Sequence, residues 1–181
     1  SVRHYNGFLI TPSGKKYSSL KVKDIVFVSL DGKYEKKYKP SSEWRFHQDI
    51  YIKKKDAQAI VHTHSTNATA LSVHKKPIPA FHYMVALAGG NDIKCAKYAT
   101  YGTRELSKNI LKALNNRKAC LIANHGQIAF DNNLPNAFEL AQEVENLSLQ
   151  YITALKLGKP KILSINEMNK VLKKAKNYKR G

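Results

Sequence analysis

The hydrophobic positions of this chain form two kinds of run that interleave along its length. Short apolar runs typical of strands cover residues 8–10, 24–30, 59–62, 120–123 and 127–130. Apolar residues at helical spacing cover residues 44–52, 65–73, 135–157 and 165–176. Strands that interleave with helices in this way predict a layered α/β domain.

Turn signals separate several of these elements. Residues 11–14 (TPSG) predict a turn after the first strand, and Asp31-Gly32 predicts a hairpin after the second. Pro40-Ser41-Ser42 precedes the helical pattern at 44–52, so we expect a serine hydroxyl to cap that helix.

The length of 181 residues fits one domain with its own core. No apolar run approaches the roughly 18 residues that a membrane span needs, so a transmembrane protein is excluded. Two cysteines, Cys95 and Cys120, are too few for a disulfide framework, which favours the reducing cytoplasm. The chain begins SVRHYN without methionine or a signal pattern, and we expect that a segment upstream is missing.

Basic residues dominate the charge, with 31 Lys and Arg against 13 Asp and Glu and a net charge of +18. Such a balance raises the possibility of a nucleic-acid-binding module. Only five of the basic residues are arginines, however, and arginine supplies most base readout. The lysines are also scattered in short runs, so we expect solvated faces that attract an anionic metabolite. The nucleic-acid module stays open as the alternative from a different class.

Three histidines are candidates for metal ligands. His62 and His64 are two residues apart in a predicted strand, which places both imidazoles on one face. His125 precedes a glycine at the end of another strand. Three neutral imidazoles with one open position form a catalytic zinc arrangement. The alternative is an incidental His-x-His pair and a buried structural His125.

Glu43 and several small residues add possible partners for such a centre. Glu43 lies at a predicted helix start, where a carboxylate is either favourable helix-end charge or a metal ligand and general base. Ser41 and Ser42 at that helix start are candidates for a phosphate site. Ser13 and Gly14 offer a second set of donors, although all four also fit plain turn and cap roles.

Six segments together resemble the class II aldolase/epimerase family, in the order in which that family carries them. They are LITPSG (9–14), PSSEWRFH (40–47), VHTH (61–64), HYMVALAGG (82–90), CAKYATYGTREL (95–106) and NHG (124–126). The resemblance covers nearly the whole chain, 1–181, and implies a single three-layer α/β domain with a mostly antiparallel central sheet flanked by helices. It also implies that a Gly-Asn pair and a helix of the family precede Ser1 and are absent from this chain.

The resemblance implies roles for individual residues. One zinc ion per subunit is expected on His62, His64 and His125, with Glu43 as fourth ligand and then as the acid/base. Tyr83, Tyr101 and Tyr178 match positions that handle the aldehyde, where Tyr101 replaces the usual phenylalanine. Ser13, Gly14, Ser41 and Ser42 match the phosphate-binding positions.

The activity implied is zinc-dependent, reversible cleavage of L-fuculose 1-phosphate to dihydroxyacetone phosphate and L-lactaldehyde through an enediolate. A related 4-epimerase of the L-ribulose-5-phosphate type is the alternative, although such epimerases carry aspartate where this chain has Glu43. The family is tetrameric, so we expect a homotetramer. An apolar stripe gives that expectation weak support from the chain itself, and it comprises Phe138, Leu140, Val144 and Leu147.

Overall fold

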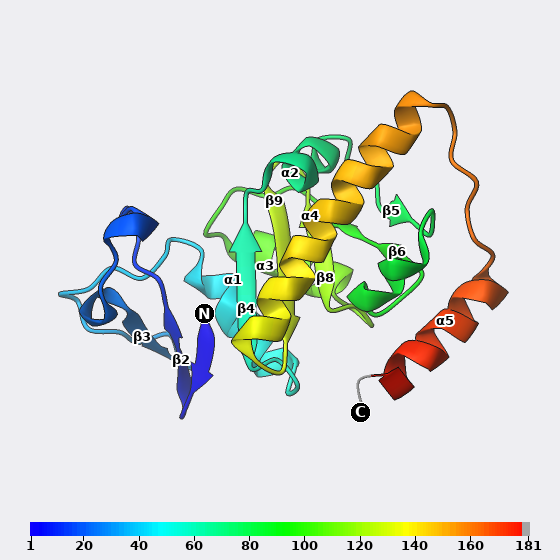
Figure 1. The fold of residues 1–181 in the computed structure, drawn as a ribbon. Coiled ribbons are helices and arrows are strands. Elements are labelled where there is room, and N and C mark those ends of the chain that lie inside the picture. The colour runs from blue at the N-terminus through cyan, green and yellow to red at the C-terminus, as the bar shows by residue number, and fades with distance from the viewer. Residues whose placement is uncertain (179–181) are drawn as a thin grey trace.

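A twisted sheet of seven strands forms the middle layer of the computed structural model, which describes residues 1–178 and side chains as far as residue 175 (Figure 1). The strand order is β3-β2-β1-β4-β9-β8-β7, and every neighbouring pair is antiparallel except β7 with β8. The strands are β1 (Val2–His4), β2 (Gly7–Ile10), β3 (Val26–Ser29), β4 (Ala59–Thr63), β7 (Cys95–Ala96), β8 (Ala119–Ile122) and β9 (Gly126–Asp131). A two-stranded ribbon of β5 (Ile78–Pro79) and β6 (Asp92–Ile93) lies beside it.

Helices cover both faces of the sheet. On one face α1 (Trp44–Lys53) and α3 (Arg104–Ala113) bury residues such as Phe46 and Ile110 against the strands. On the other face lie α2 (Thr66–Ser72), α4 (Leu134–Lys156), α5 (Ile165–Tyr178) and the short helix η3 (Tyr83–Ala88) (Figure 1). Two further 3-10 turns, η1 (Tyr17–Ser19) and η2 (Val22–Asp24), precede β3. The predicted three-layer, mostly antiparallel α/β architecture is confirmed.

The central strands explain why each helical layer finds an apolar surface. All six residues of β9 are buried, as expected for a strand covered on both faces. Ile128 and Phe130 face α1 and α3, while Ala129 between them faces α4. The same alternation in β4 puts Ile60 on the α1 side, and it sets the side on which His62 lies.

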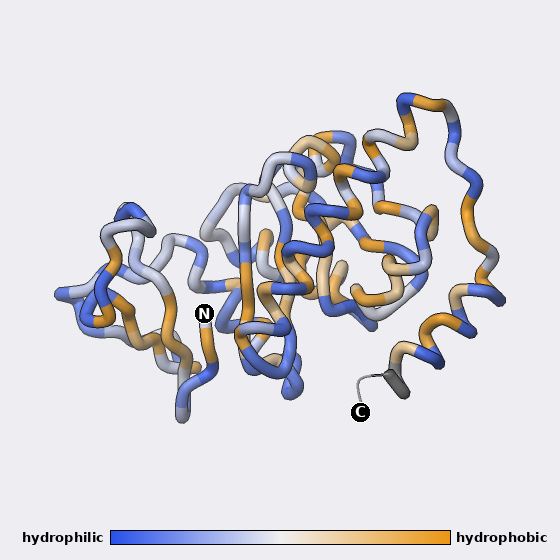
Figure 2. Tube along the Cα trace, in the orientation of Figure 1, coloured by the Kyte–Doolittle hydropathy of each residue, from blue (hydrophilic) through white to orange (hydrophobic). Residues whose placement is uncertain are grey.

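Helix α4 corrects the interpretation of the apolar stripe. Figure 2 shows apolar and polar residues alternating along this helix, as expected when one face packs on a sheet. Leu140, Val144 and Leu147 are buried against the chain's own sheet, and only Phe138 of the four is exposed. The stripe therefore belongs to the core and is no evidence for a subunit interface.

Two local predictions are wrong in detail. The turn at Asp31-Gly32 forms, but no partner strand follows it, and β3 pairs with β2 instead. The helix at 44–53 has Glu43 at its N-cap and no side-chain cap, because Ser41 lies two residues before the N-cap and its Oγ accepts a bond only from the Glu43 amide. Among the described helices, none is both long and apolar enough to cross a membrane.

Glu145 of α4 holds the start of α2, the helix that follows directly after His64. Its carboxylate accepts bonds of 2.8 Å from the backbone amides of Asn67 and Ala68 and from the Asn67 side chain. These amides belong to the first turn of α2, which has no other side-chain cap. Burial on its own raises the pKa of Glu145, but these hydrogen bonds outweigh it and hold the pKa below 4.5.

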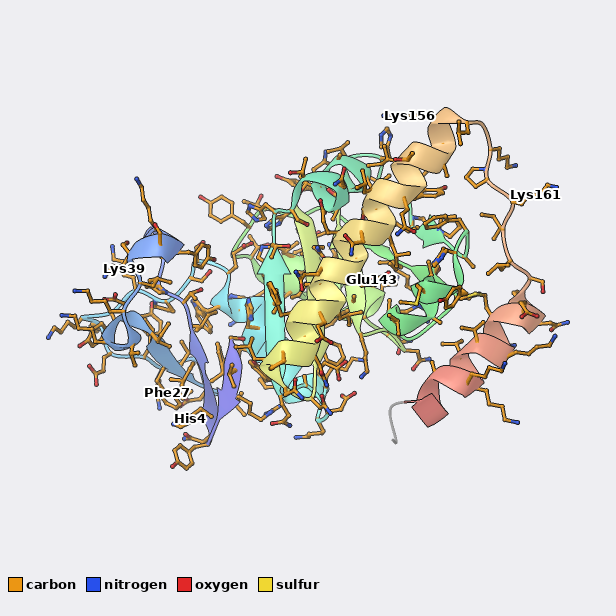
Figure 3. The ribbon with its side chains drawn as sticks, viewed as in Figure 1. His4, Phe27, Lys39, Glu143, Lys156 and Lys161 are labelled. Carbon is orange, nitrogen blue, oxygen red and sulfur yellow. The ribbon has the colours of Figure 1, made fainter. Side chains whose placement is uncertain are left out.

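We expect Glu145→Ala to lower the free energy of unfolding by about 1–3 kcal/mol at pH 7, because two amides lose a charged acceptor. The contribution of a carboxylate with a lowered folded-state pKa is present above about pH 4.5 and is lost as the pH falls further. Urea unfolding at pH 7 and pH 3 measures both effects. Glu143→Ala on the same helix (Figure 3), which makes no hydrogen bond among the described residues, is the control. If the difference in free energy of unfolding between wild type and Glu145→Ala stays constant down to pH 3, the ionised Glu145 carboxylate is not the stabilising group.

Candidate metal centre

Four side chains from three parts of the chain converge at one end of the sheet. Glu43, His62, His64 and His125 each offer one ligand atom, and these atoms all lie within 4.8 Å of one another. The structure thus brings together all four residues that the sequence proposed as metal ligands.

The pairing of β4 with β9 brings the histidines together. His62 pairs with Ile128 on the α1 side of the sheet, and His64 follows just beyond the end of β4. Glu43 comes to the same place as the N-cap residue of α1. The sequence argument that His62 and His64 share a face therefore holds in the folded chain.

A close approach of two strand ends brings in His125. The residue after it, Gly126, lies so near β4 that a Cβ atom there would be 2.4 Å from the carbonyl oxygen of Thr63. Only glycine fits this contact without moving the strands. The tight turn before β9 uses Asn124 in the left-handed region, which asparagine tolerates better than most residues.

The carboxylate oxygens of Glu43 and the Nε2 atoms of the three histidines lie close enough together to bind a single ion. Glu43 Oε2 is 2.8 Å from His62 Nε2 and 3.9 Å from His64 Nε2, while Glu43 Oε1 is 3.1 Å from His125 Nε2. The Nε2 atoms of His62 and His64 are 3.1 Å apart. The side chain of His64 is 61% exposed, whereas the other three are nearly enclosed, so the centre opens on one side.

Neighbouring charges set the protonation of the cluster. Burial alone raises the pKa of Glu43, but the close contacts with the His125 and His62 rings hold that pKa well below its usual value. Burial and the nearby His62 and His125 lower the pKa of His64. Glu43 is therefore ionised and His64 neutral near pH 7, which are the forms that bind a metal ion.

The donor set fits a divalent metal ion. Glu43 Oε1 is buried without a well-formed hydrogen bond among the described residues, and two ring nitrogens face each other at 3.1 Å. His62 Nδ1 donates to the carbonyl oxygen of Gln127 at 2.7 Å, which turns its Nε2 lone pair toward the centre. Three imidazoles and one carboxylate are ligands typical of Zn²⁺, although imidazole also suits other transition metals.

Two hollows meet at this centre. The first, of about 490 Å³, is bordered by Glu43, His62 and His64 together with Ser1, Thr11, Tyr17, Ser41, His47, Leu134 and others. The second, of about 400 Å³, is bordered by Glu43, His64 and His125 together with Ser42, Tyr98, Ala99, Tyr101 and Asn124. A molecule bound at the centre can therefore extend in two directions.

The four predicted phosphate-binding residues do not line one hollow. An antiparallel bridge of Pro12 with Pro40 brings their two segments side by side, and the Ser13 amide donates to Lys39. Ser41 borders the first hollow, whereas Ser42 borders the second. Gly14, with φ of +69°, has open space around it but borders neither.

The three tyrosines predicted to handle the aldehyde lie in different places relative to the metal cluster. Tyr101 is 67% exposed and borders the second hollow, so it lies beside the metal cluster and not in the sheet. Tyr83 is 53% exposed on η3 and borders neither hollow. Tyr178 is the last residue of α5, and its side chain lies outside the described ones.

Sequence reasoning missed residues that line the hollows, among them His47, Tyr17 and Tyr98. His47 follows Glu43 by four residues, so helical spacing could have placed both on one face of α1. Tyr17 and Tyr98 lie in loops and short turns, where no periodicity reveals which way a side chain points.

Comparisons with known proteins agree with this geometry. The model of the class II aldolase and adducin N-terminal domain matches residues 1–152. A 5-methylthioribulose-1-phosphate/5-deoxyribulose-1-phosphate aldolase of Rhodospirillum rubrum is 52% identical over 98% of this chain and 80% of its own length. An L-fuculose phosphate aldolase of Escherichia coli K12 is 50% identical over 98% of this chain and 83% of its own length. A solved L-fuculose 1-phosphate aldolase superposes with a TM-score of 0.93 at 42% identity, covering 97% of this chain and 84% of that one.

We expect His62→Ala to lower zinc affinity at least about 100-fold. The variant loses the Nε2 ligand together with the Nδ1 hydrogen bond to Gln127 that orients the ring. Zinc content after dialysis against a buffered zinc solution measures the loss. His4→Ala, an exposed histidine at the far end of β1 (Figure 3), is the matched control and should keep one zinc per chain. Full zinc content in His62→Ala would rule out this cluster as the metal centre.

Proposed function

This chain belongs to the class II aldolase family, and we propose that it is a zinc enzyme that cleaves L-fuculose 1-phosphate reversibly to dihydroxyacetone phosphate and L-lactaldehyde. Its general activity is that of a class II aldolase, a metal-dependent lyase acting on a sugar phosphate. The observation that carries the proposed bond cleavage is the convergence of Glu43 with three histidines between two hollows.

The chemistry requires charge stabilisation at a carbonyl oxygen. Breaking the bond between C3 and C4 of a ketose leaves an electron pair that is delocalised onto the neighbouring carbonyl oxygen. A divalent metal ion bound by the cluster supplies the Lewis acid for this charge. His62, His64 and His125 hold that ion, so no lysine Schiff base is needed in spite of the many lysines.

Glu43 acts as the proton carrier in this proposal. Its close contacts with His125 and His62 hold the pKa of the carboxylate well below the usual value, so Glu43 is ionised, and it borders both hollows. On substrate binding it would leave the ligand set and accept the proton that the C4 hydroxyl loses as that carbon becomes the aldehyde. It then delivers this proton to C3, the carbon that has lost its bond to the aldehyde. In the direction of synthesis it removes that same proton from dihydroxyacetone phosphate.

The substrate lies across the centre with its two halves in separate hollows. The phosphate-bearing half occupies the first hollow, beside Ser41 and the adjoining segment of Ser13 and Gly14. The aldehyde half occupies the second, where Tyr101 and Asn124 offer polar groups. Those polar groups favour an aldehyde that carries a hydroxyl, such as L-lactaldehyde.

Tyr83 acts from a neighbouring subunit in this proposal. It is exposed on η3 and borders neither hollow of its own chain. A homotetramer with sites at the subunit junctions would bring the Tyr83 of one copy to the centre of another. Tyr178 is proposed to act with the same group of aldehyde-handling residues.

A second candidate substrate is 5-methylthioribulose 1-phosphate or its 5-deoxy analogue. The Rhodospirillum rubrum relative named for these substrates is as similar to this chain as the L-fuculose phosphate aldolases are. The phosphate-bearing half is the same in both cases, and only the aldehyde differs. The choice between the candidates therefore depends on the second hollow.

The arrangement of basic residues disfavours a nucleic-acid-binding module. Lys39 lies at one end of the molecule, and Lys156 and Lys161 lie at the other (Figure 3), so they do not form one surface. Among the described arginines, Arg3 and Arg117 make hydrogen bonds within the fold, which leaves few to read bases.

The zinc-loaded protein is expected to release dihydroxyacetone phosphate from L-fuculose 1-phosphate, and prior chelation should abolish this release. The cleavage of 5-methylthioribulose 1-phosphate is measured under the same conditions, and the kcat/KM values rank the two candidate substrates. Readdition of zinc to the chelated sample is the control and should restore activity. Release that persists in a zinc-free sample, or zinc-loaded protein that cleaves neither substrate, would contradict the proposal.

Glu43→Gln is expected to lower kcat by about 10²- to 10⁴-fold, because the amide cannot carry the proton. The direct readout is deuterium exchange from heavy water into dihydroxyacetone phosphate, followed by NMR, which should cease in this variant. Glu35→Gln, an exposed carboxylate in the loop after β3, should behave as wild type. Undiminished exchange in Glu43→Gln with zinc still bound would assign the proton transfer to another group.

A further inference from the structure

His47 is a buried histidine that borders the first hollow but is not part of the metal cluster. It lies one helical turn after Glu43 on α1, and its side chain is only 5% exposed. Phe46 stacks against its ring at a centroid distance of 4.9 Å. A buried polar ring that reaches a ligand-sized hollow needs an explanation for each of its two nitrogens.

One nitrogen is engaged in a chain of hydrogen bonds inside the core. His47 Nδ1 is 2.8 Å from Ser1 Oγ, and the same oxygen is 2.8 Å from the hydroxyl of Tyr51. Tyr51 is fully buried, again one helical turn further along α1. Ser1 is fixed in place because its backbone nitrogen donates to the carbonyl oxygen of Ile60 at 2.8 Å.

The direction of these hydrogen bonds follows from the requirement that the buried Tyr51 hydroxyl donate its proton to an acceptor. A buried phenol must donate its proton, and Ser1 Oγ is the only acceptor that it has among the described residues. Ser1 Oγ donates to His47 Nδ1 in the one arrangement that gives both hydroxyl protons an acceptor among the described residues. With Nδ1 as the acceptor, the proton of the neutral imidazole must be on Nε2.

Burial keeps this ring neutral, since it lowers the pKa of His47 well below the usual value. Nδ1 is occupied by Ser1, so Nε2 is the nitrogen left to a molecule in the first hollow.

We propose that His47 is a substrate-binding residue whose Nε2–H donates to the phosphate-bearing half of the sugar phosphate, and that Ser1 and Tyr51 are positioning residues that hold it in this tautomer. This inference rests on the proposed function, because it assigns the first hollow to the phosphate-bearing half. It adds a neutral donor to a site whose serines and backbone amides already suit an anion.

The tautomer is tested on the zinc-loaded wild-type protein with ¹⁵N-labelled histidine. The NMR signals of His47, assigned through the backbone resonances of the wild-type chain, should show a protonated Nε2 and an unprotonated Nδ1. Addition of dihydroxyacetone phosphate should shift the Nε2–H signal. A proton on Nδ1 instead of Nε2 would overturn the proposal, and so would an Nε2–H signal that does not shift when dihydroxyacetone phosphate is added. Neither result requires a measurement of turnover.

Two substitutions of His47 separate hydrogen-bond donation by Nε2 from the packing of the side chain. In His47→Gln the amide nitrogen takes the place of Nε2, whereas in His47→Asn it takes the place of Nδ1. We expect His47→Asn to raise KM and the dissociation constant of dihydroxyacetone phosphate about 10- to 100-fold, with kcat changed only a few-fold. His47→Gln should stay close to wild type, and zinc content should be normal in both.

Equal behaviour of the two variants would overturn the donor role, and loss of zinc with unchanged KM would assign His47 to support of the metal centre instead. Tyr51→Phe keeps the packing and removes only the phenol proton, so it should yield a mixture of His47 tautomers and a smaller rise in KM. If these variants do not fold, the wild-type NMR experiment still decides. Wild type that cleaves no sugar phosphate would contradict the proposed function itself.

Discussion

The antiparallel pairing of β4 with β9 is the constraint on which the rest of the site depends. Its register sets His62 opposite Ile128, so both imidazoles of the His62–His64 pair turn toward α1, where Glu43 begins the helix. A slip of one residue would turn them toward α4 and dismantle the cluster. The apolar residues of β9, buried on both faces, therefore fix the chemistry as well as the core.

Much of this arrangement is visible in the sequence because it follows from periodicity. Alternation in strands and helical spacing located α1, α2, α4, α5, β2–β4, β8 and β9 to within a few residues. The amphipathic helix α3 and the two- and three-residue strands were missed, since such short segments carry too little pattern and α3 follows a loop rich in turn residues. The four metal-site residues were found because His62 and His64 share one face of a strand, His125 lies at the end of another strand, and the family resemblance adds Glu43 to them.

The limits of sequence reasoning are clearest where side chains from distant segments meet. The stripe on α4 looked like a subunit surface, but periodicity does not tell whether an apolar face packs on its own sheet or on another chain. The link of Ser1 to His47 and Tyr51 joins residues nearly fifty positions apart, so no local pattern could reveal it. Likewise, Ser41 and Ser42 are neighbours in sequence yet border different hollows.

The division of the site into two hollows has a consequence for how its specificity can change. In the proposed function, the metal ligands and the first hollow serve the part of the substrate that all ketose 1-phosphates share, whereas Tyr98, Ala99 and Tyr101 border only the second hollow. Substitutions in that loop can therefore exchange one acceptor aldehyde for another while the machinery of bond cleavage stays intact. Under this proposal, relatives named for different sugars can be equally similar to one chain, as the two aldolases compared with it are.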